Sequence, residues 1–300
     1  MTATATASQD LKSLLNSAQL PALPQSAIRL LQLSKDPDNG PAEFAVPIEA
    51  DPGLASQVLR FVNSSYFGFS REIATVKHAI TLVGIRTIKN FSLWSAVFSL
   101  MPNPRCGQLD LKKLWQDSLR RALFARIFGK AVGLRDEEEG FAAALLQDMA
   151  IPLLAKELGP DYAELFERRA GGEHRLSALE EERFGWTHAD AATVIADRWN
   201  LPPEFTRLVE RHADLEFLRS RQSNKDQRIV GLSALLPAAI DGAWPERAEF
   251  VEVFQSVADG APVDVESILT DVDEAFTEFA PVLELAAPTQ TLVELYQAAD

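Results

Sequence analysis

The amino-acid sequence predicts an all-α fold, and three observations carry this prediction. Apolar residues recur at helical spacing in most segments, for example at Leu54, Val58 and Val62. No segment shows the sustained alternation of apolar and polar residues, bounded by turn residues, that is typical of a β-strand. Apolar residues make up 47% of the 300 residues, which suffices for a sizeable core. We therefore expect helices packed on helices in one or two domains.

Start and stop signals locate several helices in the first part of the chain. Asp51-Pro52 is typical of a helix start, because an aspartate caps the first turn and proline loses no hydrogen bond there. Gly84 is a typical helix end after the apolar positions of residues 76–83. Pro47 lies within a stretch that is otherwise expected to be helical. That helix is therefore predicted either to be kinked or to start at Pro47.

A break rich in proline and glycine at residues 102–107 separates two blocks of helices, and we place the first domain boundary there. A long helix is expected to follow over residues 111–132. Further along, Ser177 and Glu180 have the spacing of a capping box at a helix start. Thr187 is expected to cap the next helix.

The formal net charge of −14 is concentrated at the C-terminal end of the sequence. Residues 241–300 contain fourteen Asp and Glu residues and a single basic residue, Arg247. Because binding to duplex phosphates requires clustered Lys and Arg, this distribution argues against nucleic acid as a main ligand. The acidic stretch is expected to form a solvated surface, or else to face basic side chains of a partner protein or of residues 207–228.

The cysteine content and the apolar stretches indicate a soluble, cytoplasmic protein. Cys106 is the single cysteine, so an intrachain disulfide is excluded, and its surroundings suggest an exposed thiol. The longest nearly uncharged apolar stretches, residues 91–101 and 229–240, are shorter than the roughly 18–20 residues of a membrane helix. Residues 1–10 lack the basic start and apolar core of a signal peptide. No membrane partner is therefore expected.

Several short strings follow one another in a characteristic order between residues 15 and 215. They are Leu20-Pro21-Ala22-Leu23-Pro24, Asp51-Pro52-Gly53-Leu54, Asn63-Ser64, the segment from Ile73 to Gly84, Leu114-Trp115-Gln116-Asp117-Ser118 and the segment from His188 to Pro202. Their order and spacing resemble the HDOD family, the "HD-related output domain" of bacterial signalling proteins.

The resemblance implies how the helices are organised. A helical N-terminal lobe is expected to pack on a degenerate HD-domain-like helical core, followed by a C-terminal helical extension. On this basis we expect a flexible N-terminus over residues 1–14, the lobe over 15–105 and the HD-like core over 106–220. The acidic helical extension then covers residues 221–300.

The resemblance also implies a set of vestigial pocket residues. In HD hydrolases, histidine and aspartate side chains hold a divalent ion that activates water. Gln147-Asp148 stand at the position of the His-Asp pair of that superfamily, and Asp117 stands at that of an earlier helix histidine. His188 matches a retained histidine, and His212 lies where the family often has two adjacent histidines.

Because glutamine offers only a neutral amide oxygen, the resemblance implies that the metal site has largely been lost. We expect no catalytic residue, no bound metal and no other cofactor. Asp148 and His188 are expected to form a buried, hydrogen-bonded pair left from an ancestral pocket. The alternative is that two histidines and two aspartates, Asp117 among them, still hold one ion.

The chain is accordingly expected to be a non-catalytic regulatory module that binds a protein partner, for example in a response-regulator or second-messenger pathway. One alternative is a weakly active metal-dependent phosphohydrolase acting on a nucleotide or a cyclic dinucleotide. Another is a sensor that binds a small ligand in the vestigial pocket. Asp51, Asn63 and Ser64 are expected either to hold a structural motif or to line a groove between the lobes.

Overall fold

A computed structural model describes residues 10–18, 20–220 and 222–298 of the chain. No strand occurs among these residues, which confirms the predicted all-α class, and none of their helices is both long and apolar enough to cross a membrane. From the N-terminus the helices are α1 (Leu11–Ser17), α2 (Gln25–Leu33), α3 (Pro41–Glu49), α4 (Pro52–Val62), α5 (Val76–Val83), α6 (Ile85–Leu100), α7 (Leu111–Ala131), α8 (Glu137–Leu146), α9 (Ile151–Leu158), α10 (Pro160–Arg168), α11 (Leu176–Phe184), α12 (His188–Arg198), α13 (Pro203–Val209), α14 (Leu215–Arg219), α15 (Lys225–Ser233), α16 (Arg247–Ala258), α17 (Val265–Phe279) and α18 (Leu292–Gln297).

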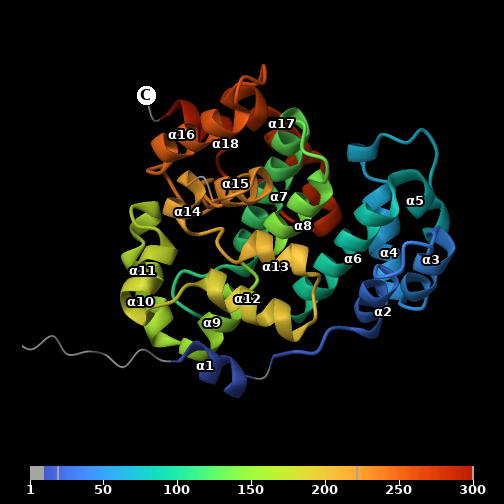
Figure 1. The fold of residues 1–300 in the computed structure, drawn as a ribbon, viewed down its shortest axis with the longest axis horizontal. Coiled ribbons are helices and arrows are strands. Elements are labelled where there is room, and N and C mark those ends of the chain that lie inside the picture. The colour runs from blue at the N-terminus through green and yellow to red at the C-terminus, as the bar shows by residue number, and fades with distance from the viewer. Residues whose placement is uncertain (1–9, 19, 221, 299–300) are drawn as a thin grey trace, which may run out of the picture.

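Helices α2 to α6 form a lobe at the right of Figure 1. In its core the rings of Phe61 and Phe91 stack with their centroids 4.1 Å apart. The predicted cap at Asp51 is confirmed, because its carboxylate accepts a hydrogen bond from the backbone N–H of Leu54 at 3.1 Å. The second carboxylate oxygen accepts a hydrogen bond from the hydroxyl of Ser26 at 3.2 Å. Asp51 therefore both starts α4 and ties it to α2.

Pro47 lies inside α3, which begins at Pro41 and ends at Glu49. Of the two arrangements predicted for this stretch, a helix start at Pro47 is therefore wrong. Pro41 provides the start, since a proline at the first helical position loses no hydrogen bond. The side chain of Glu43 reinforces this start by accepting a hydrogen bond from the backbone N–H of Gly40 at 2.9 Å.

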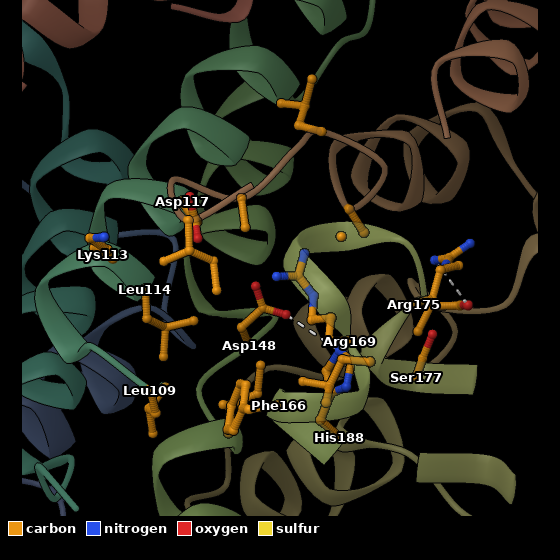
Figure 2. Close-up of a pocket in the computed structure, with 18 of the residues that line it drawn as sticks. Leu109, Lys113, Leu114, Asp117, Asp148, Phe166, Arg169, Arg175, Ser177 and His188 are labelled. Atoms are coloured by element: carbon orange, nitrogen blue, oxygen red, sulfur yellow. Dashed lines mark hydrogen bonds and ion pairs between the residues drawn. The ribbon is translucent and has the colours of Figure 1, made fainter. Parts of the chain in front are cut away.

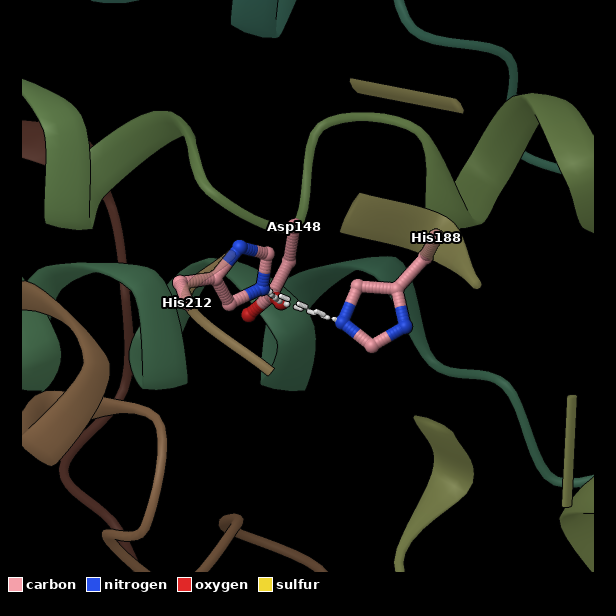
Figure 3. A group of neighbouring side chains, drawn as sticks. All are labelled: Asp148, His188 and His212. Carbon is pink, nitrogen blue, oxygen red and sulfur yellow. Dashed lines mark hydrogen bonds and ion pairs between the residues drawn. The ribbon is translucent and has the colours of Figure 1, made fainter. Parts of the chain in front are cut away.

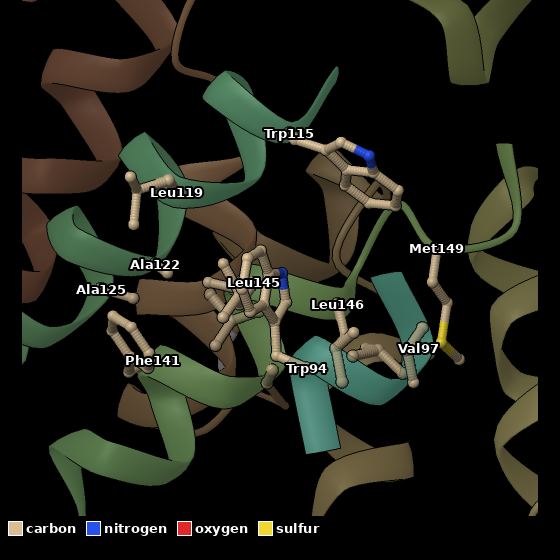
Figure 4. Packing of buried hydrophobic residues seen from close by; sticks show 14 of the residues in the cluster. Trp94, Val97, Trp115, Leu119, Ala122, Ala125, Phe141, Leu145, Leu146 and Met149 are labelled. Atoms are coloured by element: carbon tan, nitrogen blue, oxygen red, sulfur yellow. The ribbon is translucent and has the colours of Figure 1, made fainter. Parts of the chain in front are cut away.

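Helix α7 is the centre of the second block and packs against α8, α15 and α17. Its bounds, Leu111–Ala131, agree with the helix predicted over residues 111–132. Figure 4 shows the seam between lobe and core, where Trp94 and Val97 of α6 lie beside Leu145 and Leu146 of α8. Buried side chains of this size each contribute about 1.5–3 kcal/mol of transfer free energy. The lobe is therefore attached to the core by apolar packing.

The C-terminal extension packs on both the core and the lobe. Phe254 of α16 stacks on Phe128 of α7 with the ring centroids 4.2 Å apart. Phe279, at the end of α17, lies against Phe61 of the lobe with a centroid distance of 4.9 Å. The apolar face of α17 is thus used twice, once along α7 and once against the lobe.

Part of the acidic extension faces basic side chains of the same chain, which is one of the arrangements expected from the sequence. Arg219 forms an ion pair with Glu252 of α16 at 2.7 Å. Nearby, Arg228 donates a hydrogen bond to the hydroxyl of Ser256 at 2.7 Å. The two members of the ion pair are largely exposed, so the pair contributes about 1 kcal/mol or less.

The prediction of an exposed thiol at Cys106 is wrong. Its side chain is 4% exposed, and its sulfur donates to the carbonyl oxygen of Gly159 at 3.4 Å. Burial also raises the pKa of the Cys106 thiol, which makes it a weaker nucleophile at neutral pH. The local composition pointed to a surface loop, whereas the residues that cover this thiol come from a distant part of the chain.

Helix α1 lies against α12 of the core, away from the lobe that follows it in the sequence (Figure 1). Arg198 holds it there by donating a hydrogen bond to the carbonyl oxygen of Leu15. The indole N–H of Trp199 donates to the carbonyl oxygen of Pro21 at 2.9 Å and so fixes the connection between α1 and α2. Of the N-terminus predicted to be flexible, residues 1–14, the first nine lie outside the described residues.

The contact between α14 and α15 requires a glycine. A Cβ atom at Gly231 would lie 2.2 Å from a methyl carbon of Leu218, which is fully buried and has no room to retreat. Gly231→Ala is therefore expected to lower the free energy of unfolding by about 1–3 kcal/mol in urea denaturation. The matched control is Gly140→Ala in α8, where a Cβ atom meets nothing within 4 Å. This control is expected to stabilise the folded chain by up to about 1 kcal/mol. Equal effects of the two substitutions would contradict the claim that the contact at Gly231 requires a glycine.

Candidate functional site

Three buried side chains meet where the ends of several helices come together. Asp148 lies between α8 and α9, His188 is the first residue of α12, and His212 follows α13. Figure 3 shows the two imidazoles directed at the Asp148 carboxylate. The Oδ1 atom of Asp148 lies 3.4 Å from Nε2 of His188 and 3.6 Å from Nε2 of His212. The two Nε2 atoms are 3.2 Å apart.

Hydrogen bonds on the far side of each imidazole determine which ring nitrogen carries the proton. Nδ1 of His212 lies 2.7 Å from the carbonyl oxygen of Val209, which can only accept, so this nitrogen is the donor. Nδ1 of His188 lies 2.6 Å from Oε2 of Glu180 and donates in the same way. In the neutral rings both Nε2 atoms are therefore acceptors, and they face each other and a carboxylate oxygen. A cation at the centre would satisfy all three converging acceptors, whereas a shared proton would satisfy two of them.

This donor set fits one divalent metal ion. Among the described residues, Asp148, His188 and His212 form a group whose ligand atoms lie within 4.8 Å of one another. Two imidazole nitrogens and one carboxylate oxygen suit a borderline ion such as Zn²⁺ or Fe²⁺. Burial, and after it the neighbouring His188, lowers the pKa of His212 to about 3, which keeps this ring in the neutral form that a metal requires. A bound ion would neutralise Asp148 and activate a coordinated water.

Glu180 is the residue that orients His188. Its carboxylate is fully buried and accepts hydrogen bonds from the backbone N–H of His188 at 2.9 Å, from the ring Nδ1 of the same residue and from the hydroxyl of Tyr162. Such a partner fixes both the orientation and the tautomer of a metal-binding histidine. The predicted capping box of Ser177 and Glu180 is wrong, because α11 begins at Leu176 and has no side-chain cap. The signal that the sequence offered for this contact was the carboxylate of Glu180 on the inward face of α11.

Arg121 of α7 is the second neighbour that the sequence did not reveal. Its guanidinium forms an ion pair with Oδ2 of Asp148, the oxygen that is turned away from the two imidazoles. The side chains of Arg121 and Asp148 are 13% and 4% exposed, so the pair is shielded from water. Asp148 is thus shared between a guanidinium on one oxygen and the histidine pair on the other.

Asp117 and Gln147 are buried near this group but do not belong to it. Asp117 accepts a hydrogen bond from the backbone N–H of Ala239 at 2.6 Å. Gln147 donates from its amide to the hydroxyl of Ser233 at 3.3 Å. The proposal of a ligand set with two aspartates is therefore replaced by a set with one aspartate and two histidines, at Asp148, His188 and His212.

The three clustered residues open onto a cavity of about 110 Å³. Figure 2 shows Lys113 and Asp117 on one side of it, Arg175 and Ser177 on the other, and Asp148 between them. Its charged walls are largely paired: Arg175 contacts Glu246 at 3.0 Å. The guanidinium of Arg169, which also lines the cavity, donates two hydrogen bonds to the carboxylate of Asp241, at 2.7 and 2.6 Å. The cavity is therefore lined both by charged side chains that are largely paired and by apolar side chains such as Leu109, Leu114 and Phe166.

The remaining candidate residues lie in the lobe. The side-chain amide of Asn63 donates to the carbonyl oxygens of Leu59 and Ile73, both at 2.9 Å, and its oxygen accepts from the backbone N–H of Ile73 at 2.7 Å. Ser64 donates to the carbonyl oxygen of Phe61 at 2.7 Å. With Asp51 at the start of α4, these contacts fasten both ends of one helix and the loop after it.

Comparison with known protein families shows which proteins this chain resembles. The family model for the HDOD domain matches residues 20–215. An uncharacterised protein of Treponema pallidum (strain Nichols) is 23% identical over 201 residues. That alignment covers 65% of this chain and 38% of the relative, so the chain corresponds to well under two thirds of the relative's length.

Three solved structures have a similar fold. An HDOD domain protein of unknown function from Geobacter sulfurreducens is 20% identical with a TM-score of 0.73, and the match covers 92% of this chain and 97% of the other. A candidate phosphohydrolase from Shewanella amazonensis SB2B is 18% identical with a TM-score of 0.70, covering 92% and 99%. A candidate signal transduction protein from Marinobacter aquaeolei VT8 is 20% identical with a TM-score of 0.68, covering 91% and 59%. At these identities the likeness establishes the fold.

The buried carboxyl group of Asp117 is expected to make the free energy of unfolding depend on pH. Burial raises the pKa of Asp117 to about 6, against the opposing effect of Arg121 and Arg120. The folded chain therefore binds more protons than the unfolded chain between pH 3.8 and about 6, and stability falls as the pH rises through this window. Asp117→Asn, which can still accept from Ala239, is expected to stabilise by about 1–3 kcal/mol at pH 7.5 and by little at pH 4.

Urea denaturation at the two pH values measures this difference. Asp110→Asn serves as the control, because it changes an exposed helix cap on the same helix and is expected to have an effect of a few tenths of a kcal/mol at either pH. Loss of stability in Asp117→Asn at pH 7.5 would show that pairing with the arginines outweighs the burial of the carboxylate.

Proposed function

The chain belongs to the HDOD domain family, and from this premise we propose that it is a non-catalytic regulatory module that acts in signal transduction by binding a protein partner. In the described fold, apolar packing joins the helical lobe to the core, so a partner could bind across both. The similar protein from Marinobacter aquaeolei VT8, described as a candidate signal transduction protein, agrees with this proposal.

The composition of the buried centre is the observation that carries the proposal. Gln147 stands where a metal-binding histidine would be expected, and its amide is engaged by Ser233. One oxygen of Asp148 is engaged by Arg121, so this carboxylate is not free to bridge two ions. A hydrolytic centre of the paired-ion type, in which two ions clamp the attacking and leaving oxygens, lacks both a ligand and a bridging group here.

The acidic extension is the surface that we assign to the partner. Asp271, Glu274 and Glu278 are exposed on α17, opposite the apolar face that packs on α7. A surface of one sign speeds association with a partner of the opposite sign and favours that partner over others. The partner is therefore expected to present a basic surface, and its association is expected to weaken as salt is added.

The second candidate function is a weakly active metal-dependent phosphohydrolase. It is favoured by the group of Asp148, His188 and His212 next to a cavity, because three protein ligands with an open fourth position are typical of catalytic zinc sites. In such an enzyme the chain would use these three residues to hold the ion, with Glu180 keeping His188 in the required tautomer. The cavity itself favours a third function, a sensor of a small ligand.

Assays of phosphodiester hydrolysis separate the first two functions. We expect purified protein with Mn²⁺ to hydrolyse bis-p-nitrophenyl phosphate and cyclic dinucleotides no faster than Mn²⁺ in buffer, and Asp148→Ala to behave identically. Asp226→Ala, which changes a carboxylate paired with Arg207 outside the cluster, is the matched control. Metal-dependent turnover that persists in the control and disappears in Asp148→Ala would replace the regulatory proposal with the enzymatic one.

Thermal denaturation with added nucleotides tests the sensor. A ligand present at 100 times its Kd stabilises the folded state by about 2.7 kcal/mol, which is readily seen as a rise in Tm. The regulatory proposal predicts no rise with free nucleotides or cyclic dinucleotides. A rise that Arg169→Ala removes would assign the cavity to a small ligand.

A further inference from the structure

Arg121 is the permanent cation that pairs directly with Asp148. Arg121 places its guanidinium on Oδ2 of Asp148, while Oδ1 of the same carboxylate faces the two imidazoles. Guanidinium keeps its proton under physiological conditions, so the positive charge beside Asp148 is fixed. Asp117 precedes Arg121 by four residues on α7, and it lines the same cavity. Arg121 therefore interacts with two carboxylates at this cavity, those of Asp148 and Asp117.

A guanidinium and a divalent ion compete for the charge of one carboxylate. When both oxygens of Asp148 are occupied, its single negative charge is divided between the two cations. The two cations also repel each other across a medium of low effective dielectric constant, where charges separated by a few ångströms interact strongly. Arg121 should therefore weaken the binding of a metal ion at Oδ1, even though it also helps to hold Asp148 in place.

We propose that Arg121 is an internal substitute for a metal ion. It neutralises Asp148 in the metal-free chain. It also lowers the affinity of the group formed by His188, His212 and Asp148 for a divalent cation. The proposal goes beyond the regulatory function, because it concerns metal binding at the buried centre and not the binding of a protein partner. It also explains how a buried carboxylate is tolerated in the metal-free chain, since an uncompensated buried charge is strongly destabilising.

The test compares two substitutions that shorten the same side chain but differ in charge. Arg121→Gln removes the charge and keeps an amide that can donate to Asp148, so the carboxylate retains a hydrogen-bond partner. Arg121→Lys keeps the charge. Arg126→Gln is the control for position: Arg126 lies on the same helix and is paired with Glu138 at 2.6 Å, with side chains that are 18% and 15% exposed.

Mn²⁺ binding to the full chain is measured by equilibrium dialysis at pH 7.5, with electron paramagnetic resonance to identify the bound ion. The Kd of Arg121→Gln is expected to be about tenfold or more below that of the wild type, because one like charge has been removed. Arg121→Lys and Arg126→Gln are expected to lie within about threefold of the wild type, since both retain the charge next to Asp148. His188→Ala in the Arg121→Gln background is expected to abolish the gain.

Three results would overturn the proposal. Weaker binding by Arg121→Gln would mean that Arg121 positions Asp148 for the ion and does not compete with it. Equal gains in Arg121→Gln and Arg121→Lys would assign the effect to side-chain length. Absence of Mn²⁺ binding by Arg121→Gln would mean that something other than this cation keeps metal out. None of these results bears on turnover, so each is distinct from a failure of the proposed function.

Discussion

The need to compensate one buried carboxylate organises the centre of this molecule. Asp148 lies at the junction of α8 and α9, where a negative charge out of contact with water is costly unless it is paired. Arg121 satisfies one of its oxygens, and His188 and His212 approach the other. Because these partners come from α7, α12 and the turn after α13, the pairing fixes how four parts of the core meet.

The hydrogen-bond partners around this centre determine which nitrogen of each imidazole faces inward. Glu180 and the carbonyl oxygen of Val209 each take the Nδ1 proton of one imidazole, so both Nε2 atoms are left as acceptors that point inward. Such an arrangement suits a single cation and not a chain of neutral hydrogen bonds. The contribution of Arg121 opposes this, because it brings a fixed positive charge to the same carboxylate. On the proposal made above, Glu180 and the Val209 carbonyl favour a metal ion at this site, and Arg121 opposes it.

Local signals in the sequence predicted most of the helices but only part of the site. The caps at Asp51 and Thr187 and the helix end at Gly84 were read correctly, because each depends on interactions within a few residues. The contact of Glu180 with His188 was missed, since its spacing also fits a capping box, and burial on α11 decides between the two. The ion pair of Arg121 leaves no local signal at all, because its partner lies in the distant turn between α8 and α9 and is brought close only by the tertiary fold.

The central claim, that three acceptors converge on one cation position with Arg121 still in place, is tested most directly by a crystal structure of the protein soaked with Zn²⁺. We expect one anomalous peak at about 2.0–2.2 Å from Nε2 of His188, Nε2 of His212 and Oδ1 of Asp148. We also expect that the Arg121 guanidinium remains on Oδ2. A peak bound by other residues, or a pair of ions with Arg121 displaced from the carboxylate, would contradict this claim.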